Sequence, residues 1–366
     1  MLPSSGARRA GLAAAVAAIP VVLAYRFAHV YRVRAGFPRR HEPLWAPDAL
    51  GMAYEEVAVP TTDGLTLAGW YMPASGSLTP APGIALVHGW ESARDRTLPH
   101  AQFLHAAGFH VLAVDVRGHG QNEPETLPVS VGEFAIDAAA AVRWLAARPE
   151  VSAIGLLGHS MGAAGALVAA ADDPAVAAVV GVSTPADPYR LTRQTFRLAG
   201  LPIPGPIAWP LAWLTTHVFL QPRGHTVADV SATRAVKAIG APVLLVHGDE
   251  DHVVPVGHIA RLAAIRRAAR PDAVTETLVV HGGHHSWLFE FAEFRATVAR
   301  FFAASLGGPL SPDAAAHAAE TIAAARLPEP ERLTALDDEP GGIRSLLRVF
   351  RRQTPTTSTD VPAQEA

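Results

Sequence analysis

A serine lies at the centre of Gly-His-Ser-Met-Gly, residues 158–162, between an apolar run at 154–157 and an alanine-rich run from Ala163. Small residues beside a serine let the backbone turn sharply and present the hydroxyl at the end of a strand. The first turn of a following helix favours the negative charge that develops during acyl transfer. This context predicts that Ser160 is a nucleophile; the alternative is an ordinary serine in a packing turn.

A serine hydroxyl is a weak nucleophile until a base takes its proton, and a histidine oriented by a carboxylate is a suitable base. In this strand–turn–helix context the expected chain order is serine, acid, histidine. Acidic residues follow an apolar run at 243–247, and His284 and His285 follow a later one. On the residues alone, the candidate acids are Asp251, Asp249 and, more remotely, Asp187.

Apolar runs that end in glycine or a polar residue predict the strands that position these side chains. They lie at 82–89, 109–115, 152–158, 175–183, 242–248 and, less continuously, 273–283. Helical patterns lie between or after them, at 97–108, 131–149, 162–174, 257–271 and 286–306. Runs apolar on both faces that alternate with helices predict an α/β fold, with a mostly parallel sheet flanked by helices. An Asp-Gly turn at Asp63 predicts a hairpin before the first of these runs.

From about Tyr54 to Phe302 the sequence resembles the α/β-hydrolase family of serine hydrolases. The family pattern G-x-x-D-x-x-V-P matches residues 248–255, which implies that Asp251 is the acid. Its G-x-x-H spacing matches residues 282–285, which implies that His285, rather than the adjacent His284, is the base. The segments "VDVRGHGQN" (114–122) and "DGLTLAGWYMP" (63–73) add to the resemblance.

Two backbone N–H groups are expected to stabilise the oxyanion. One belongs to the residue after the nucleophile, Met161. The resemblance implies that Trp90, after His88-Gly89, supplies the other. The glycine-adjacent histidines His88, His119, His159 and His247 are expected to hold loops by hydrogen bonds, and residues 115–120 to brace the turn beside the site.

The stretch from 184 to 240 is too long for a short crossover and is rich in proline. Connections of this length inside a domain usually serve as lids or binding loops. We therefore expect a helical lid here, with Trp209 and Trp213 contributing to substrate binding. The alternative is a structural insertion without substrate contact.

Residues 1–40 predict a membrane anchor. No charge occurs from Ala10 to Tyr25, and with Arg26 snorkelling the run approaches the ~20 residues that span a bilayer. Two arginines precede the run and five follow it, so the positive-inside rule favours a cytoplasmic catalytic domain. One alternative is a signal peptide cleaved after Val22-Leu23-Ala24, which would give a secreted enzyme, and another is an apolar helix with neither role.

Composition excludes several other functions. The chain has no cysteine, so disulfides, thiolate metal sites and cysteine nucleophiles are ruled out. A net charge of −3 gives no support for nucleic-acid binding. No phosphate-binding or dinucleotide-binding glycine motif follows a strand, and the triad order explains the histidines at 281–285 better than a metal does, so we expect neither cofactor nor metal.

The resulting prediction is a hydrolase domain at 50–306, followed at 307–366 by a helical and then disordered tail. The expected activity is cleavage of carboxylic esters or thioesters, with a small-molecule or lipid ester as substrate. The anchor and the apolar lid favour substrates with an acyl chain. A peptidase or amidase of the same fold, and a non-catalytic binding protein, are the alternatives.

Overall fold

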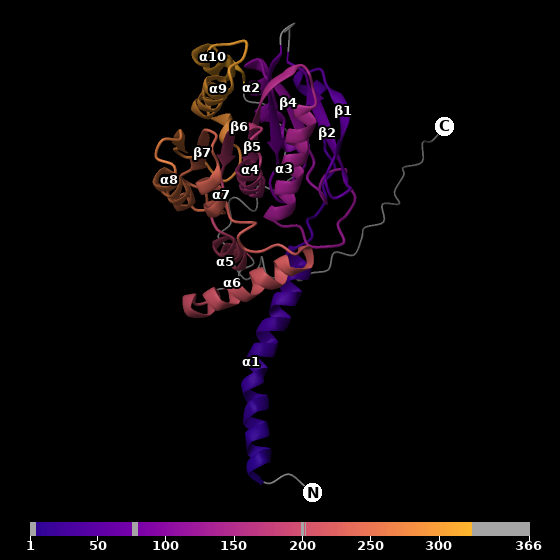
Figure 1. Ribbon diagram of the computed structural model, residues 1–366, viewed down its shortest axis with the longest axis vertical. Coiled ribbons are helices and arrows are strands. Elements are labelled where there is room, and N and C mark those ends of the chain that lie inside the picture. Colours follow the sequence, from indigo (N-terminus) through magenta and orange to yellow (C-terminus); the bar gives the residue numbers. More distant parts are fainter. Residues whose placement is uncertain (1–4, 75–79, 199–200, 202, 324–366) are drawn as a thin grey trace, which may run out of the picture.

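Eight strands form one sheet within the residues that the computed structural model describes, which are 5–74, 80–198, 201 and 203–323. The strands are β1 (Glu55–Pro60), β2 (Thr66–Met72), β3 (Ala81–Val87), β4 (His110–Val114), β5 (Val151–His159), β6 (Val176–Val182), β7 (Val243–Gly248) and β8 (Thr275–Val280). Their order is β1-β2-β4-β3-β5-β6-β7-β8 (Figure 1). The first two strands form the predicted antiparallel hairpin, β2 also pairs antiparallel with β4, and all other pairs are parallel.

Helices lie on both faces of this sheet and beyond one of its edges. They are α1 (Ser5–Ala35), α2 (Leu98–Ala106), α3 (Val131–Ala146), α4 (Met161–Asp172), α5 (Pro188–Leu198), α6 (Gly205–Leu220), α7 (Ala232–Ala238), α8 (Gly257–Ala269), α9 (Ala292–Leu306) and α10 (Pro312–Thr321). Short 3₁₀ helices lie at Pro47–Leu50, Arg94–Thr97, Gln221–Arg223 and Leu288–Glu290. The helices α3, α4, α7 and α8 pack into one apolar core, whereas α2, α9 and α10 pack into a second core on the other face.

The predicted α/β class is confirmed, and the reason is visible in the strands. Every residue of β3, β4 and β7 is buried, as expected for parallel strands covered on both faces. Each parallel strand is followed by a helix or a long connection, so their carboxyl ends meet at one edge of the sheet. That edge carries the candidate site.

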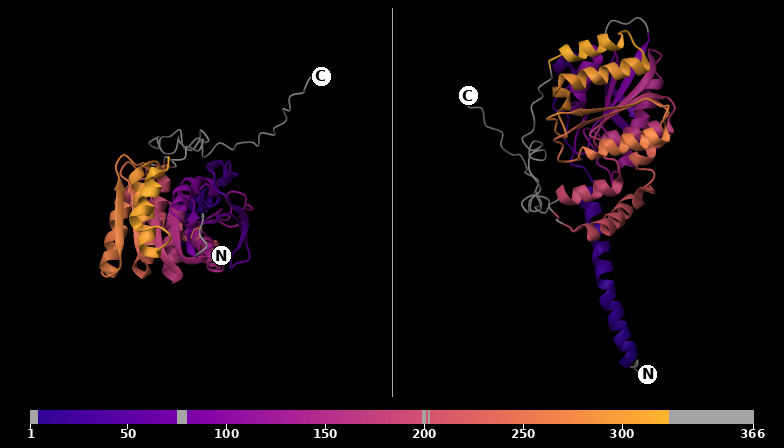
Figure 2. Two further views of the ribbon diagram at one scale, coloured as in Figure 1. Left: turned by 90° about the horizontal axis from the view of Figure 1, so that it is seen from above. Right: turned by 90° about the vertical axis from the view of Figure 1, so that its left-hand side faces the viewer.

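Three helices lie beyond this edge of the sheet, and we call α1, α5 and α6 the basal layer (Figures 1 and 2). The helix α5 begins shortly after β6 ends, and α6 packs against α1. On α1, the rings of Phe27 and Tyr31 meet Phe196 of α5 edge-on, with centroids 5.7 and 5.4 Å apart. The stretch in which a lid was predicted therefore contains two helices that contact the predicted anchor, and its role as a lid stays a prediction.

The C-terminal part differs from its predicted boundary. The helix α10 is not a separate tail, because its residues Ala315 and Ala319 are buried against the domain. Arg295 of α9 donates hydrogen bonds to the carbonyl oxygens of Ala319 and Glu320, both at 3.1 Å. The sequence analysis did not predict this docking, which combines buried alanines of α10 with hydrogen bonds from a buried arginine of α9. The predicted disordered segment lies outside the described residues.

Candidate active site

Ser160 occupies a strained turn between β5 and α4. Its φ of 54° and ψ of −119° fall in a region that a residue with a side chain rarely adopts. A Cβ on Gly158 would collide with the carbonyl group of Gly162, and a Cβ on Gly162 would collide with the carbonyl oxygen of His88. The two glycines of the motif are thus required by packing, and Ser160 is held in place by a 2.8 Å hydrogen bond from its N–H to Val182.

Two distant side chains meet Ser160 at the edge of the sheet. The Nε2 atom of His285 lies 3.1 Å from Oγ of Ser160. The Nδ1 atom of the same ring lies 2.8 Å from Oδ2 of Asp251. With Nδ1–H donating to the carboxylate, Nε2 presents a lone pair to the serine hydroxyl, which is the arrangement that removes a proton from a nucleophile.

Asp251 is buried and fully engaged. Its Oδ1 accepts hydrogen bonds from the backbone N–H groups of Val253 (2.9 Å) and Val254 (2.7 Å). Its Oδ2 also lies 3.1 Å from Nε2 of His247. Burial alone would raise the pKa of Asp251, but the contacts with His247 and His285 outweigh it and hold that pKa well below the usual range. The carboxylate is therefore ionised and able to stabilise a charged His285.

Close backbone contact between two loops brings Asp251 to His285. A Cβ on Gly248, at the end of β7, would collide with the carbonyl group of Gly283. The N–H of Glu250 donates to that carbonyl oxygen at 3.0 Å. Glycine at both positions lets the loops after β7 and β8 touch, and this contact sets the spacing of the acid and the histidine.

The backbone of His285 is fixed by two polar side chains. Both Nε2 of His159 (2.8 Å) and Oγ of Ser183 (2.9 Å) donate to the carbonyl oxygen of His285. Burial lowers the pKa of His159 to about 3, so this ring stays neutral. Sequence reasoning expected a loop-holding role for His159 but missed Ser183, whose only signal was a polar residue directly after an apolar strand.

The other candidates for acid and base lie elsewhere. The Nε2 atom of His284 is 3.9 Å from the carboxylate of Glu250, near the surface. Asp249 binds Nδ1 of His281 and the N–H of Gly282, both at 2.8 Å. Asp187 accepts hydrogen bonds from the first turn of α5. Among the predicted acids and bases, Asp251 and His285 form the chain of hydrogen bonds that reaches Ser160.

The loop after β3 lies beside Ser160. A Cβ on Gly89 would be 3.3 Å from Cβ of Ser160, so Trp90 directly follows a residue in contact with the site. His88 fixes this loop, because its Nδ1–H donates to the carbonyl oxygen of Gly89 (2.7 Å) and its Nε2 accepts from the N–H of Val116 (3.0 Å). Met161 is the first residue of α4. The two predicted oxyanion donors, Trp90 and Met161, are thus each adjacent to a residue at the site.

Buried ion pairs brace the loop after β4, as expected. Asp115 pairs with Arg94, and both side chains are almost inaccessible to water. Arg117 pairs with Asp137 and Asp63, each at 2.5 Å. These contacts fix the turn that follows β4.

The two tryptophans of the predicted lid are exposed on α6. Trp209 is 46% and Trp213 55% accessible. The guanidinium of Arg193 lies 4.0 Å from the ring centroid of Trp209, and the ring of Trp213 packs on His217 at 4.2 Å. These contacts are with other residues of α5 and α6, so a role in substrate binding stays a prediction.

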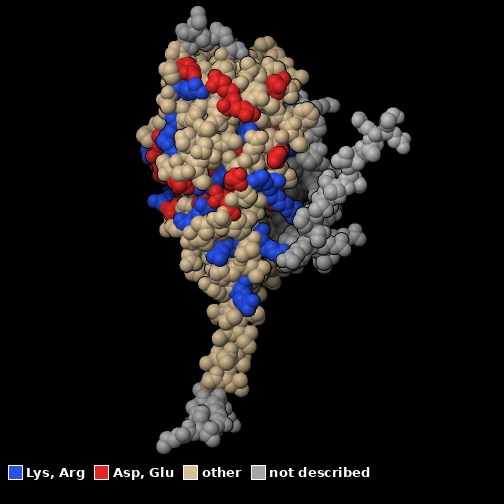
Figure 3. All heavy atoms as spheres, turned by 90° about the vertical axis from the view of Figure 1, so that its right-hand side faces the viewer, with Lys and Arg blue, Asp and Glu red and all other residues tan. Residues whose placement is uncertain are grey.

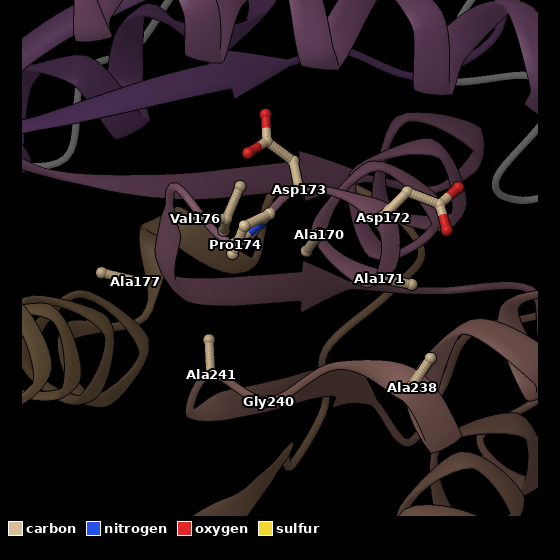
Figure 4. A pocket seen from close by; sticks show the side chains of 10 residues that line it. All are labelled: Ala170, Ala171, Asp172, Asp173, Pro174, Val176, Ala177, Ala238, Gly240 and Ala241. Carbon is tan, nitrogen blue, oxygen red and sulfur yellow. The ribbon is translucent and has the colours of Figure 1, made fainter.

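A shallow hollow lies at the opposite edge of the sheet (Figure 4). Its lining includes Asp172 and Asp173 at the end of α4 and Gly240 before β7. The strands β6 and β7 begin here, whereas Ser160 lies where β5 ends, so the hollow is separate from the candidate site. Within the described part of the chain, no cluster of three or more histidine, aspartate or glutamate side chains is arranged to hold a metal.

The comparison with known proteins agrees with this architecture. A family described as serine aminopeptidase, S33, matches residues 79–220. The Mycobacterium tuberculosis protein Rv2307c is 32% identical over 247 residues, which cover 67% of this chain and 76% of that protein. Human protein ABHD12B is 26% identical over 63% of each chain.

Solved structures share the fold. The esterase Pf2001 of Pyrococcus furiosus superposes with a TM-score of 0.58 at 24% identity, over 74% of this chain and 98% of its own. The α/β-hydrolase GrgF of a Penicillium species gives 0.53 at 22% identity, over 70% and 99%. Together with the sheet order, the strained serine turn and the sequence matches, these similarities show that the chain belongs to the α/β-hydrolase family.

Proposed function

We propose that this protein is a serine hydrolase that cleaves carboxylic esters or thioesters of acyl chains through an acyl-enzyme on Ser160. The observation that carries the proposal is the continuous contact from Ser160 Oγ through the His285 ring to Asp251, at 3.1 and 2.8 Å. A serine with a positioned base and a buried, ionised orienting acid can attack an acyl carbonyl. A binding protein without activity would not need this arrangement.

The reaction follows from the geometry. His285 takes the proton of Ser160 as Oγ attacks the carbonyl carbon, and the N–H groups of Met161 and Trp90 bind the oxyanion. The protonated ring then gives its proton to the leaving alcohol or thiol as the acyl-enzyme forms. Water, deprotonated by His285, attacks the acyl-enzyme and releases the acid. Asp251 keeps the ring oriented and stabilises its positive charge throughout.

The peptidase alternative is favoured by one observation, which is the description of the matching family as a serine aminopeptidase. An aminopeptidase must recognise a free amino group, for which a carboxylate near the site is the natural partner. Residues 188–228, which contain α5 and α6, include no aspartate or glutamate. This lack of acid in α5 and α6 favours an ester over a peptide with a free N-terminus.

The proposal includes a membrane anchor. The span Gly11–Ala35 is long and apolar enough to cross a bilayer, and only 6% of its most apolar window is buried in the protein. Leu12, Val21 and Leu23 are each more than 60% exposed. A helix so exposed and apolar is stable in a membrane, and the arginines in and just after its C-terminal part favour a cytoplasmic domain.

The test is hydrolysis of p-nitrophenyl esters from acetate to octanoate, together with a matched thioester and an amino-acid p-nitroanilide. We expect turnover of the esters that increases with acyl length, and none of it in Ser160→Ala. Ser152→Ala, at the exposed start of the same strand, is the matched control and should keep full activity. Turnover of the anilide alone would favour the peptidase, and a folded wild-type protein inactive on every substrate would contradict catalysis.

A further inference from the structure

The basal layer has a surface that the hydrolase mechanism does not use. On α6, Pro206, Ile207, Trp209, Pro210, Trp213 and His217 are exposed. Helical spacing places Trp209, Trp213 and His217 on one stripe, while Ala208, Ala212 and Thr215 are buried against the protein. A soluble surface rarely gathers apolar rings in this way unless another phase or molecule covers them.

Charge on the same layer is of one sign. The second half of α1 carries Arg26, Arg32 and Arg34, and α5 carries Arg190, Arg193 and Arg197, whereas the sequences of α1, α5 and α6 contain no aspartate or glutamate. Figure 3 shows basic residues, and no acidic ones, on the visible face where the α1 stalk joins the domain. An apolar helix face beside arginines is complementary to a bilayer surface with anionic headgroups.

The position of α6 is fixed relative to α1. Gly36, directly after α1, is buried between Pro128 and Phe219 of α6, where a Cβ would lie 2.7 Å from the former and 3.2 Å from the latter. The carbonyl oxygen of Gly36 also accepts a 2.8 Å hydrogen bond from the N–H of Val129. These contacts hold α6 beside the point where α1 leaves the domain, across the α1 axis in both views (Figures 1 and 2).

We propose that α6 docks in the headgroup region of the bilayer that α1 spans, with Trp209 and Trp213 at the apolar boundary and the arginines of α5 on anionic headgroups. The proposal rests on the anchor and goes beyond the hydrolase activity. Tryptophan favours this zone because its ring is apolar and its N–H is polar. Arg193, stacked on Trp209, and the exposed Arg197 lie on the helix next to α6. The catalytic edge of the sheet would then face the membrane.

The chain offers a clean test because it has no cysteine. Single-cysteine variants of the full chain at Ile207 and His217 would carry a nitroxide spin label, with the protein reconstituted in vesicles of phosphatidylcholine and phosphatidylglycerol. Val274→Cys, at a half-exposed position next to the start of β8, is the aqueous control, and Val16→Cys reports the anchor. The readout is the ratio of label accessibility to oxygen and to a neutral nickel chelate, which rises with depth.

We expect ratios at positions 207 and 217 that exceed the ratio at 274 by several-fold and lie below the ratio at 16. Ratios at 207 and 217 equal to that at 274, with position 16 deep, would overturn the docking of α6 and leave the anchor standing. An aqueous ratio at position 16 as well would overturn both. Hydrolysis of p-nitrophenyl acetate by each labelled variant is measured separately from the depth ratios. Activity at the wild-type level shows that the variant is folded and that the proposed activity is present, whatever the depth ratios are.

A charge test completes the design. Replacing Arg190 and Arg197 with glutamate in the Ile207→Cys protein should reduce the depth ratio several-fold in vesicles with phosphatidylglycerol, and much less in phosphatidylcholine alone. Arg143→Glu, exposed near the end of α3, is the matched control and should leave the ratio unchanged. If the variant with glutamate at positions 190 and 197 has the same depth ratio as the Arg143→Glu control in both lipid compositions, anionic headgroups have no role in the docking of α6.

Discussion

Around His285, hydrogen bonds fix both the ring and the backbone carbonyl oxygen, whereas on α6 the exposed side chains are mostly apolar. The carboxylate of Asp251 has partners on both oxygens, and the carbonyl oxygen of His285 has two donors. The basal layer instead combines exposed tryptophans with arginines, and the sequences of α1, α5 and α6 contain no acidic residue. The first region fixes its side chains relative to one another through hydrogen bonds. The second region exposes apolar and basic side chains that can contact another phase or molecule.

The largest expected effect would separate two neighbouring histidines of the catalytic edge. His285→Ala removes the group that contacts both Ser160 and Asp251, so kcat/KM should fall roughly 10⁴-fold or more. His284→Ala alters a side chain near the surface and should stay within about twofold. The measurement is ester kinetics of both variants. Their melting temperatures are compared with that of the wild type to show that both remain folded. Equal losses would show that the ring facing Ser160 has been misassigned.

The next effect concerns the two acids of the loop after β7. Asp251→Asn keeps the shape of the side chain but removes the charge that orients His285, and kcat should fall by about 10³- to 10⁴-fold. Asp249→Asn should change kcat by less than about twofold, because Asp249 binds only His281 and Gly282. If Asp251→Asn keeps the wild-type kcat at saturating substrate concentration, Asp251 has no role in the mechanism.

A third prediction tests how the catalytic edge is stiffened. Arg94→Met leaves the buried Asp115 without its partner, and the free energy of unfolding should fall by about 3–5 kcal/mol. Arg300→Met breaks an exposed pair with Asp313 and should cost less than about 1 kcal/mol. Urea denaturation of both variants measures the difference. If both variants lose the same free energy of unfolding, burial does not make the Arg94–Asp115 pair more important for stability than the exposed pair.

The smallest expected effect contrasts a buried histidine of the domain with the exposed basic residues of the basal layer. Burial lowers the pKa of His100 to about 4, below its ordinary value of about 6.5. The unfolded chain then binds more protons than the folded one, so stability is lost as the pH falls from 6.5 towards 4.

At pH 5 this loss amounts to roughly 2 kcal/mol for one such group. His100→Leu keeps an apolar side chain among Phe103, Phe289 and Phe294, so its drop in melting temperature between pH 7.5 and pH 5 should be smaller than that of the wild type. The other buried histidines, such as His88, retain most of the dependence. An identical drop in both proteins would show that His100 does not resist protonation.

Much of the catalytic edge was predictable because local patterns determine it. Apolar runs bounded by glycine predicted the strands, and the small residues around Ser160 predicted a turn that the collisions at Gly158 and Gly162 explain. The choice between His284 and His285 could not be made from local patterns, because both histidines directly follow the same apolar run and glycines. It depends on how the loop after β8 touches the loop after β7, and only the family resemblance pointed to His285 beforehand.

The basal layer was less predictable, because its contacts join segments far apart in the chain. The sequence predicted an apolar helix and a lid separately. Nothing local indicated that Phe27 and Tyr31 would pack on Phe196, or that Gly36 would be buried against α6. Exposure of Trp209 and Trp213 was likewise unpredictable, since an apolar ring on a helix is more often buried.

The most direct measurement is the site at which a fluorophosphonate probe reacts with the folded wild-type protein. An activated serine forms a stable covalent adduct, which peptide mass spectrometry locates to a single residue. The account predicts one adduct, on Ser160, that is absent in Ser160→Ala and strongly reduced in His285→Ala. An adduct on another serine with Ser160 unmodified, or no adduct on well-folded protein, would contradict it.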